Sequence, residues 1–292
     1  MFHHGIRVKC QFIKSAGFGV LFAGLLLIFS QSCSALTGDV PESLDRGFHQ
    51  MYNLDFTGAH KTFENWEATH PEDPLGAASN AAAYLFGEFE RLHILEFDIF
   101  IEDRKLDNFD KLLDPQVKAA FEAELSKADE IATKILEKAP ENTNALFAKV
   151  LTDGLRADYA ALLEKRKMAA LDSLKSSRCT AEKLIAIDPS YADAYLAIGL
   201  ENYVLGIRSA PSRFMLRLTG AETNKEKGIA SLKLTAEKGR YLAPYARLLL
   251  AIACIRAKDR DTAKQLLAEL VKEFPQNHRY RTELEQLEQL LS

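Results

Sequence analysis

The sequence is poor in cysteine and tryptophan, with four Cys and one Trp in 292 residues. Cys179 and Cys254 lie within helical patterns, each far from any other cysteine, and this spacing excludes a Cys-x-x-Cys redox motif and a paired-cysteine zinc site. A disulfide between two such isolated residues does not follow from the sequence. We therefore interpret both as small, buried hydrophobic residues.

Motifs of catalysis are also missing. The chain contains no Gly-x-Ser-x-Gly, His-Glu-x-x-His or phosphate-binding loop. An excess of basic residues is absent too, because the formal net charge is −4, which argues against nucleic acid as a general partner. We predict that the protein is not an enzyme and uses no cofactor or metal.

Long hydrophobic runs are limited to one, Gly17–Phe29, which follows three basic residues and precedes the first acidic residue, Asp39. A basic segment followed by a short apolar run is the pattern of a secretory signal peptide. The run is shorter than the roughly 20 residues of a membrane-spanning helix. We expect a signal peptide over residues 1–32, a short linker over 33–40 and a helical repeat domain over 41–292.

Two processing sites compete after this run. Ser30-Gln31-Ser32-Cys33 resembles a bacterial lipobox, in which Cys33 would carry the lipid, although Ser30 stands where that pattern usually has Leu. Cys33-Ser34-Ala35 alternatively offers the small-x-small pattern of ordinary signal peptidase, and an uncleaved anchor is the third possibility. The expected location is the bacterial cell envelope, either periplasmic or attached to the outer membrane through Cys33, with secretion as the alternative.

Strand-like alternation is absent after Leu36, and apolar residues instead recur at intervals of three and four, which predicts helices almost throughout. The pattern is interrupted where Pro and Asn cluster. These interruptions lie at residues 70–74, 113–116, 139–144, 187–193 and 274–278.

A small residue precedes each of several helix-ending positions by twelve residues. The pairs are Ala59 and Pro71, Ala128 and Pro140, Ser177 and Pro189, Gly228 and Arg240, and Ala263 and Pro275. Phe63, Leu232 and Leu267 follow the small residue by four in three of them. A small residue lets two helices cross closely, and Pro cannot continue a helix.

This spacing resembles the second helix of the tetratricopeptide repeat (TPR), and the stretch Ala194–Gly199 resembles the aromatic-x-x-Leu-Gly signature of its first helix. The resemblance implies an all-α, right-handed superhelical solenoid of about five antiparallel helix hairpins with a C-terminal capping helix. The hairpins would span residues 41–70, 75–139, 143–188, 191–240 and 242–274, and the capping helix 277–291.

In such a solenoid the first helices line a concave groove that binds a protein or peptide. Our candidates for partner contact are Tyr195, Asn202 and Tyr203, together with three arginines of the insertion 206–220, namely Arg208, Arg213 and Arg217. That insertion is interpreted as an irregular capping loop with surface ion pairs, or as a corner that reads anions through its arginines. Membrane contact is the third option.

Chaperone-binding TPR domains carry Lys and Asn on their first helices. Here Leu44 and Phe48, or Leu196 and Leu200, stand at the corresponding places, so that peptide-clamp function is not implied. The aromatic residues Tyr84, Phe86, Phe89, Phe97 and Phe100 are predicted to belong to the core. The acidic insertion 101–114 is expected to project from one face.

Two alternatives to a protein-binding scaffold of an envelope assembly remain. A closed apolar pocket would indicate a solute-binding helical protein that serves a transporter. A metal-dependent helical-bundle enzyme would use the Glu-x-x-His pairs Glu67 with His70 and Glu90 with His93. His70, directly before Pro71, is instead expected to meet the carbonyl groups at a helix end.

Overall fold

The computed structural model describes residues 43–94 and 113–289, all within one compact unit, Asp39–Ser292. The predictions for the signal peptide, the linker, Cys33, Phe97, Phe100 and most of the acidic insertion fall outside these residues. The described residues form helices and no strand, as predicted. None of the described helices is long and apolar enough to cross a membrane.

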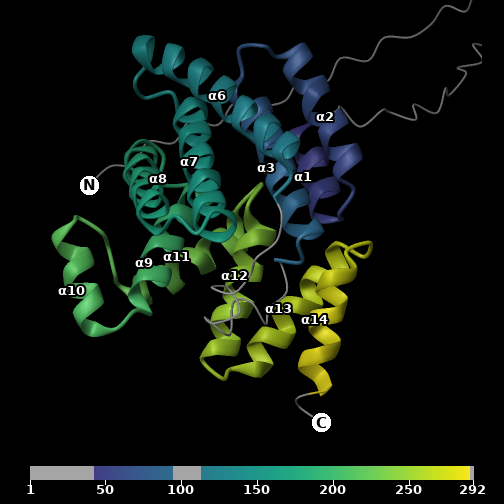
Figure 1. The fold of residues 1–292 in the computed structure, drawn as a ribbon, viewed down its shortest axis with the longest axis vertical. Coiled ribbons are helices and arrows are strands. Elements are labelled where there is room, and N and C mark those ends of the chain that lie inside the picture. The colour runs from purple at the N-terminus through teal and green to yellow at the C-terminus, as the bar shows by residue number, and fades with distance from the viewer. Residues whose placement is uncertain (1–42, 95–112, 290–292) are drawn as a thin grey trace, which may run out of the picture. The chain divides into compact units, whose positions relative to one another are not determined.

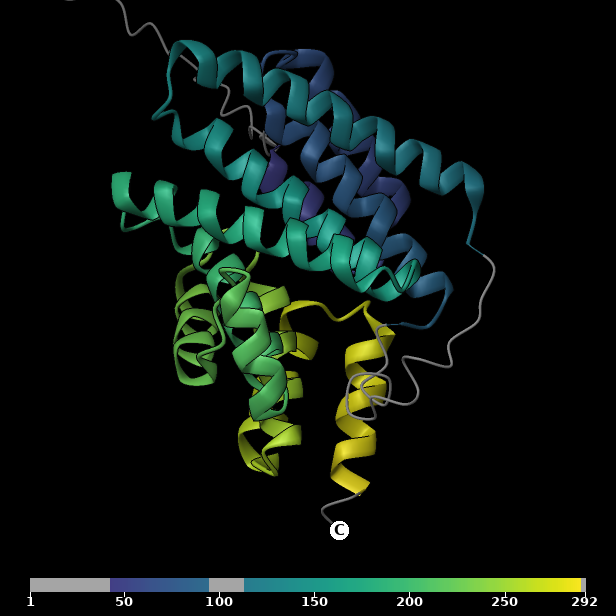
Figure 2. The ribbon, with the colours of Figure 1, turned by 60° about the vertical axis from the view of Figure 1, so that its left-hand side comes forward.

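The helices pack in antiparallel pairs along the chain, three of them joined by short turns (Figure 1). The pairs are α1 (Leu44–Tyr52) with α2 (Phe56–Thr69), α3 (Pro74–Arg91) with α6 (Pro115–Lys138), α7 (Thr143–Asp158) with α8 (Lys167–Ile187), α9 (Tyr195–Gly206) with α11 (Lys225–Lys238), and α12 (Ala243–Arg256) with α13 (Arg260–Glu273). The helix pairs predicted from the TPR-like spacing are thus confirmed. Figure 2 shows α6, α7 and α8 running side by side.

The small residues of the twelve-residue spacing lie where paired helices cross. Ala59, Ala128 and Ala263 are fully buried, as are the larger residues packed beside them, including Phe63. A Cβ atom on Gly47 of α1 would lie 2.2 Å from Cε1 of Phe63, so only glycine permits this approach. The twelve-residue spacing therefore marks the positions at which paired helices contact each other.

The second helices end two residues before the positions that the spacing marks. α2 ends at Thr69 before Pro71, and α13 ends at Glu273 before Pro275. α11 ends at Lys238 although Arg240 replaces Pro. His70 Nδ1 lies 3.3 Å from the carbonyl oxygen of Trp66, which confirms the expected contact at the end of α2.

The last helix, α14 (His278–Gln289), covers the outer side of α13 through Tyr280, Leu284 and Leu287. Tyr280 and Leu287 are buried. The predicted capping helix is confirmed over these residues. Capping elements of this kind shield the apolar face that the last repeat would otherwise expose.

The first hairpin also contacts the last ones. The phenol group of Tyr52 donates a hydrogen bond to the carbonyl oxygen of Tyr241 (3.1 Å), and the side-chain amide of Asn277 donates one to the carbonyl oxygen of Tyr52 (2.8 Å). The rings of Phe48 and Tyr241 stack with centroids 4.9 Å apart. The N-terminal part of α12 consequently lies against the inner face of the first helices.

Two predictions are wrong, one about the structure of the insertion 206–220 and one about the burial of Cys179. The insertion 206–220 is not an irregular loop, because residues Ala210–Leu218 form the helix α10. Cys179 is exposed and Cys254 half-buried, so Cys179 is not a core residue. Both thiols are free.

Candidate functional site

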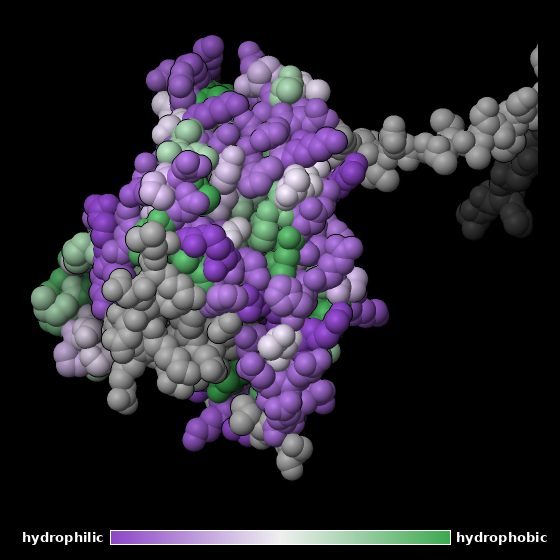
Figure 3. Space-filling model, turned by 45° about the vertical axis from the view of Figure 1, so that its right-hand side comes forward, coloured by the Kyte–Doolittle hydropathy of each residue, from purple (hydrophilic) through white to green (hydrophobic). Residues whose placement is uncertain are grey.

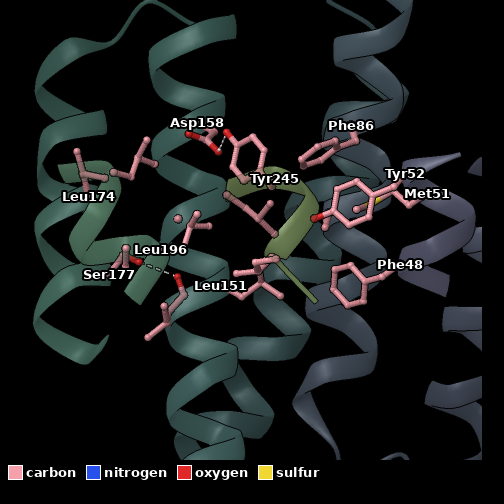
Figure 4. A pocket seen from close by; sticks show the side chains of 17 residues that line it. Phe48, Met51, Tyr52, Phe86, Leu151, Asp158, Leu174, Ser177, Leu196 and Tyr245 are labelled. Carbon is pink, nitrogen blue, oxygen red and sulfur yellow. Dashed lines mark hydrogen bonds between the residues drawn. The ribbon is translucent and has the colours of Figure 1, made fainter. Parts of the chain in front are cut away.

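An apolar pocket lies on the inner face of the first helices (Figure 4). The cavity is small, about 40 Å³, and is partly open to solvent, so a ligand larger than a few water molecules must push lining side chains apart. It is lined by Phe48, Met51, Tyr52, Ala82, Phe86, Val150, Leu151, Gly154, Leu155, Asp158, Leu174, Ser177, Leu196, Ala197, Leu200, Leu242 and Tyr245. Phe48, Leu196 and Leu200 stand where the TPR resemblance places groove positions, and here these positions are apolar.

The pocket has two unlike walls. The rings of Phe48, Tyr52 and Phe86, contributed by α1 and α3, form an aromatic wall (Figure 4). Leu151 of α7 and Leu174 of α8 belong to the opposite, aliphatic wall. A cavity with such walls favours an apolar ligand, because filling it removes apolar surface from water.

Leu242 and Tyr245, at the start of α12, close one side of the pocket. Their position is fixed by Asp193, a buried carboxylate that accepts hydrogen bonds from the backbone N–H groups of Arg240 (3.0 Å) and Leu242 (2.9 Å). Burial raises the pKa of Asp193, and the backbone hydrogen bonds partly offset this effect. The segment before α12 is therefore held in place by hydrogen bonds to a residue that is far away in the sequence.

Asp158 is the one carboxyl group of the pocket lining. The phenol group of Tyr245 donates a hydrogen bond to its Oδ2 atom at 3.1 Å (Figure 4). Burial raises the pKa of Asp158 to about 7, against a smaller lowering by Tyr245, and no cation contributes. Burial likewise raises the pKa of Tyr245 well above its usual value. The pocket thus contains a carboxyl group without a positive partner among the described residues.

The other polar side chains of the lining already have partners. The hydroxyl of Ser177 donates to the carbonyl oxygen of Val150 at 2.8 Å, and that of Tyr52 donates to Tyr241. Asp158 is therefore the side chain of the lining that can still accept hydrogen bonds from a ligand, since a carboxylate accepts several hydrogen bonds. It stands at the end of α7, where a five-residue π-helical turn, Tyr159–Leu163, begins. Such turns are frequent at functional sites.

The predicted partner-binding residues of α9 do not face this pocket. Asn202 is fully buried, where its amide donates to Glu222 (2.7 Å) and its Oδ1 accepts from the backbone N–H of Asn224 (3.0 Å). Tyr203 is buried, and its backbone lies against Gly228 of α11. The prediction that both face a groove is wrong, because this side of α9 is the one that crosses α11.

Tyr195 and the three arginines lie apart from the pocket. The Tyr195 hydroxyl donates to the carbonyl oxygen of Pro189 at 3.2 Å. Arg213 donates to the carbonyl oxygens of Gly206 and Arg208, and Arg217 donates to the hydroxyl of Thr223. The structure therefore brings the arginines together around α10 but joins none of the six candidates to the pocket.

The Glu-x-x-His pairs are engaged in other contacts. Glu67 pairs with Lys127 and accepts from Asn80, and the ring of His70 stacks on that of Trp66 with centroids 3.9 Å apart. Glu90 binds Arg279. The described part of the chain contains no group of three or more His, Cys, Asp or Glu side chains that could hold a metal ion.

Comparison with known proteins shows likeness in structure but not in sequence. No family model and no curated protein matches the sequence. The fold is similar to the crystal structure of a thermophilic TPR protein from Thermus thermophilus, with a TM-score of 0.43 and 18% sequence identity over 85% of this chain and 98% of that chain. What the present chain binds does not follow from this likeness.

The sequence pattern did not reveal Asp158 and Tyr245 as a pair, because they are separated by 87 positions and belong to different hairpins. One signal was present. Asp158 is an isolated acid within an otherwise apolar stretch, ADYAALL, at the end of a first helix. A charged residue at such a place indicates either a helix boundary or a site.

Proposed function

We propose that this chain is a non-enzymatic binding protein whose inner pocket holds a small apolar molecule with a cationic or hydrogen-donating head at Asp158. The observation that carries this proposal is a half-buried carboxyl group in an apolar pocket with no positive partner among the described residues. An ionised carboxylate in such surroundings is unstable unless it is paired.

The head group follows from the chemistry of Asp158. A primary amine would bring the missing positive charge and three hydrogen-bond donors, whereas an alcohol would bring one donor and no charge. A carboxylate ligand would be repelled by ionised Asp158, or would have to bind while Asp158 keeps its proton. We therefore expect the affinity to fall in the order amine, alcohol, carboxylate.

The expectation of a peptide lying along a concave groove receives less support than this pocket. An extended chain would need the inner face that Leu242 and Tyr245 occupy, and Asp193 holds that segment in place. The apolar pocket, although partly open to solvent, supports the solute-binding alternative. The fold remains a scaffold for binding, with the small molecule inside it.

A non-enzymatic role is favoured by the composition of the pocket. Its lining contains no histidine, and the hydroxyl of its one serine, Ser177, donates to a backbone carbonyl group. Nucleophilic catalysis requires a hydroxyl or thiol beside a base. The pair formed by Asp158 and Tyr245 has no such nucleophile next to it among the residues that line the pocket.

Export and lipidation at Cys33 stay part of the proposal, carried by the signal-peptide pattern alone. Labelling cells with palmitate tests them. We expect label on the wild-type chain and none on Cys33→Ala. Label that survives this substitution, or a wild-type chain without label, rejects the lipid anchor.

Calorimetric titration with n-octylamine, n-octanol and n-octanoate tests the head-group rule, because the three probes share one apolar chain. We expect the wild-type protein to bind octylamine at least about ten-fold more tightly than octanoate, which is about 1.4 kcal/mol. Asp158→Asn should remove this preference. Equal affinities of the wild type for all three probes, or no binding, would reject the proposal. Native mass spectrometry of the protein purified from its own envelope would show a bound small molecule.

A further inference from the structure

The helix α10 presents apolar side chains to solvent. None of its nine residues is buried, and Phe214, Met215 and Leu218 are 63%, 62% and 67% exposed. They are three of the five large hydrophobic residues that are exposed in the described part of the chain. Most of the surface in Figure 3 is hydrophilic, with hydrophobic residues at the left edge, on the side where Figure 1 places α10.

Positive charge accompanies these side chains. Arg208, Arg213 and Arg217 lie around α10, and the sequence has no acidic residue between Asn202 and Ala221. No carboxylate of the described residues forms an ion pair with any of the three arginines. The nearby acids have other cations, since Glu201 pairs with Arg178 and Glu222 with Lys227.

The orientation of α10 is fixed. Leu216 points inward and packs against a small cluster of Leu171, Leu205 and Ala221. Arg213 hydrogen-bonds the carbonyl oxygen of Gly206 at the end of α9, and Arg217 hydrogen-bonds Thr223 beyond the end of α10. The helix is therefore anchored on one side, and the opposite side stays apolar and exposed.

We propose that α10 is a membrane-contact element that inserts Phe214, Met215 and Leu218 into the surface of a bilayer containing anionic lipids. Apolar side chains flanked by basic ones are the composition of helices that lie in a membrane interface. Each arginine near such a surface strengthens binding by about five-fold.

A lipid surface fits α10 better than a folded partner. Three exposed side chains provide a few hundred Å² of apolar surface, whereas a stable protein interface buries about 800 Å² on each partner. A second copy of the chain would bring like-charged arginines together. A bilayer needs no further area and supplies the negative charge.

Tryptophan substitutions with brominated lipids test this element, provided that they are made in a Trp66→Phe background, because Trp66 would otherwise contribute fluorescence of its own. Met215→Trp places the reporter on α10, and Met168→Trp places it on α8 at a residue with the same type of side chain and similar exposure, 67%. Vesicles would contain brominated phosphatidylcholine with or without about one third phosphatidylglycerol, a composition chosen to supply anionic headgroups.

We expect strong quenching of the Met215→Trp signal by the anionic vesicles, weaker quenching by the neutral ones, and little quenching of the Met168→Trp signal. Arg208→Gln removes a charge whose side chain makes no hydrogen bond to the described residues, and it should raise the lipid concentration for half-maximal quenching about five-fold. Equal quenching at both positions overturns the proposal. The proposal is also overturned if anionic vesicles do not quench the fluorescence of Met215→Trp. Self-association through α10 in place of membrane contact would give this result.

Discussion

The inner pocket and α10 both gather apolar side chains around charged groups, but they do so in opposite surroundings. Phe86 in the pocket wall is 7% exposed and Phe214 on α10 is 63% exposed. The pocket surrounds a single carboxyl group, whereas α10 is surrounded by three guanidinium groups. The two regions therefore suit different ligands, a small cationic or hydrogen-donating molecule inside and an anionic surface outside.

This contrast teaches that composition alone does not identify a site. Both regions combine Phe, Met and Leu with charge, and the difference comes from the packing of distant helices. In the pocket, apolar burial stabilises the fold as well as shaping the site. On α10 the same residue types contribute little to stability and remain available for contact.

The largest expected effect is the difference between the two regions in their contribution to the free energy of unfolding. Phe86→Ala should lower the free energy of unfolding by about 3–5 kcal/mol, because it leaves a cavity among buried residues. Phe214→Ala, the matched substitution on α10, should change it by no more than about 0.5 kcal/mol. Urea unfolding followed by circular dichroism measures both. Similar losses for the two variants would contradict the assignment of one to the interior and the other to the surface.

The next effect concerns the pH dependence of stability. The pKa of Asp158 is about 7 in the folded protein and about 3.9 when unfolded, so the folded state holds the proton more tightly. Its contribution is most favourable below about pH 4 and is lost as the pH rises toward 7, with a total on the order of 2–4 kcal/mol. Asp158→Asn should remove this decline and be more stable than the wild type at pH 8.

Glu124 is the matched control for this measurement. Burial also raises its pKa to about 7, but it lies between α3 and α6 and outside the pocket lining. Glu124→Gln should remove the part of the pH dependence of stability that Glu124 causes. It should leave the affinity for octylamine unchanged. If Asp158→Asn declines with pH as steeply as the wild type, the assigned surroundings of Asp158 are wrong.

The smallest effect concerns the contact between the first and last hairpins. Arg240 donates two hydrogen bonds to Asp45, at 2.7 and 2.6 Å, but the side chains are 64% and 43% exposed. A double-mutant cycle with Asp45→Ala and Arg240→Ala should give a coupling energy below about 1 kcal/mol. A coupling above about 2 kcal/mol would show that this surface pair, and not the aromatic packing of Phe48 and Tyr241, holds α1 against the end of the stack.

The hairpins could be predicted because their determinants are local. A small residue such as Ala59 and a helix-ending residue such as Pro71 act within twelve positions, and the helices follow that spacing. The face of α9 was predicted wrongly because Asn202 and Tyr203 look equally suited to a groove and to a helix crossing. Only the close approach of Gly228 to Tyr203 decides between them.

The pocket could be predicted only in part. Phe48, Leu196 and Leu200 were noted only as apolar residues at peptide-clamp positions, not as a binding site, and no local pattern shows that α12 closes the groove. That closure depends on contacts such as Asp193 with Leu242, which span 49 positions. The pairing of Asp158 with Tyr245 follows from the same closure and was equally invisible.

Filling the pocket tests the central claim most directly. Gly154 lines it, and a Cβ atom there would meet only Ser177 Oγ at 3.7 Å, an ordinary contact, so Gly154→Ala is tolerated, whereas the larger side chain of Gly154→Leu more than fills the small cavity. Calorimetric titration with octylamine should give an unchanged dissociation constant for Gly154→Ala and at least a ten-fold weaker one for Gly154→Leu, while both variants stay folded. Undiminished binding by folded Gly154→Leu would contradict the claim that the inner pocket is the binding site.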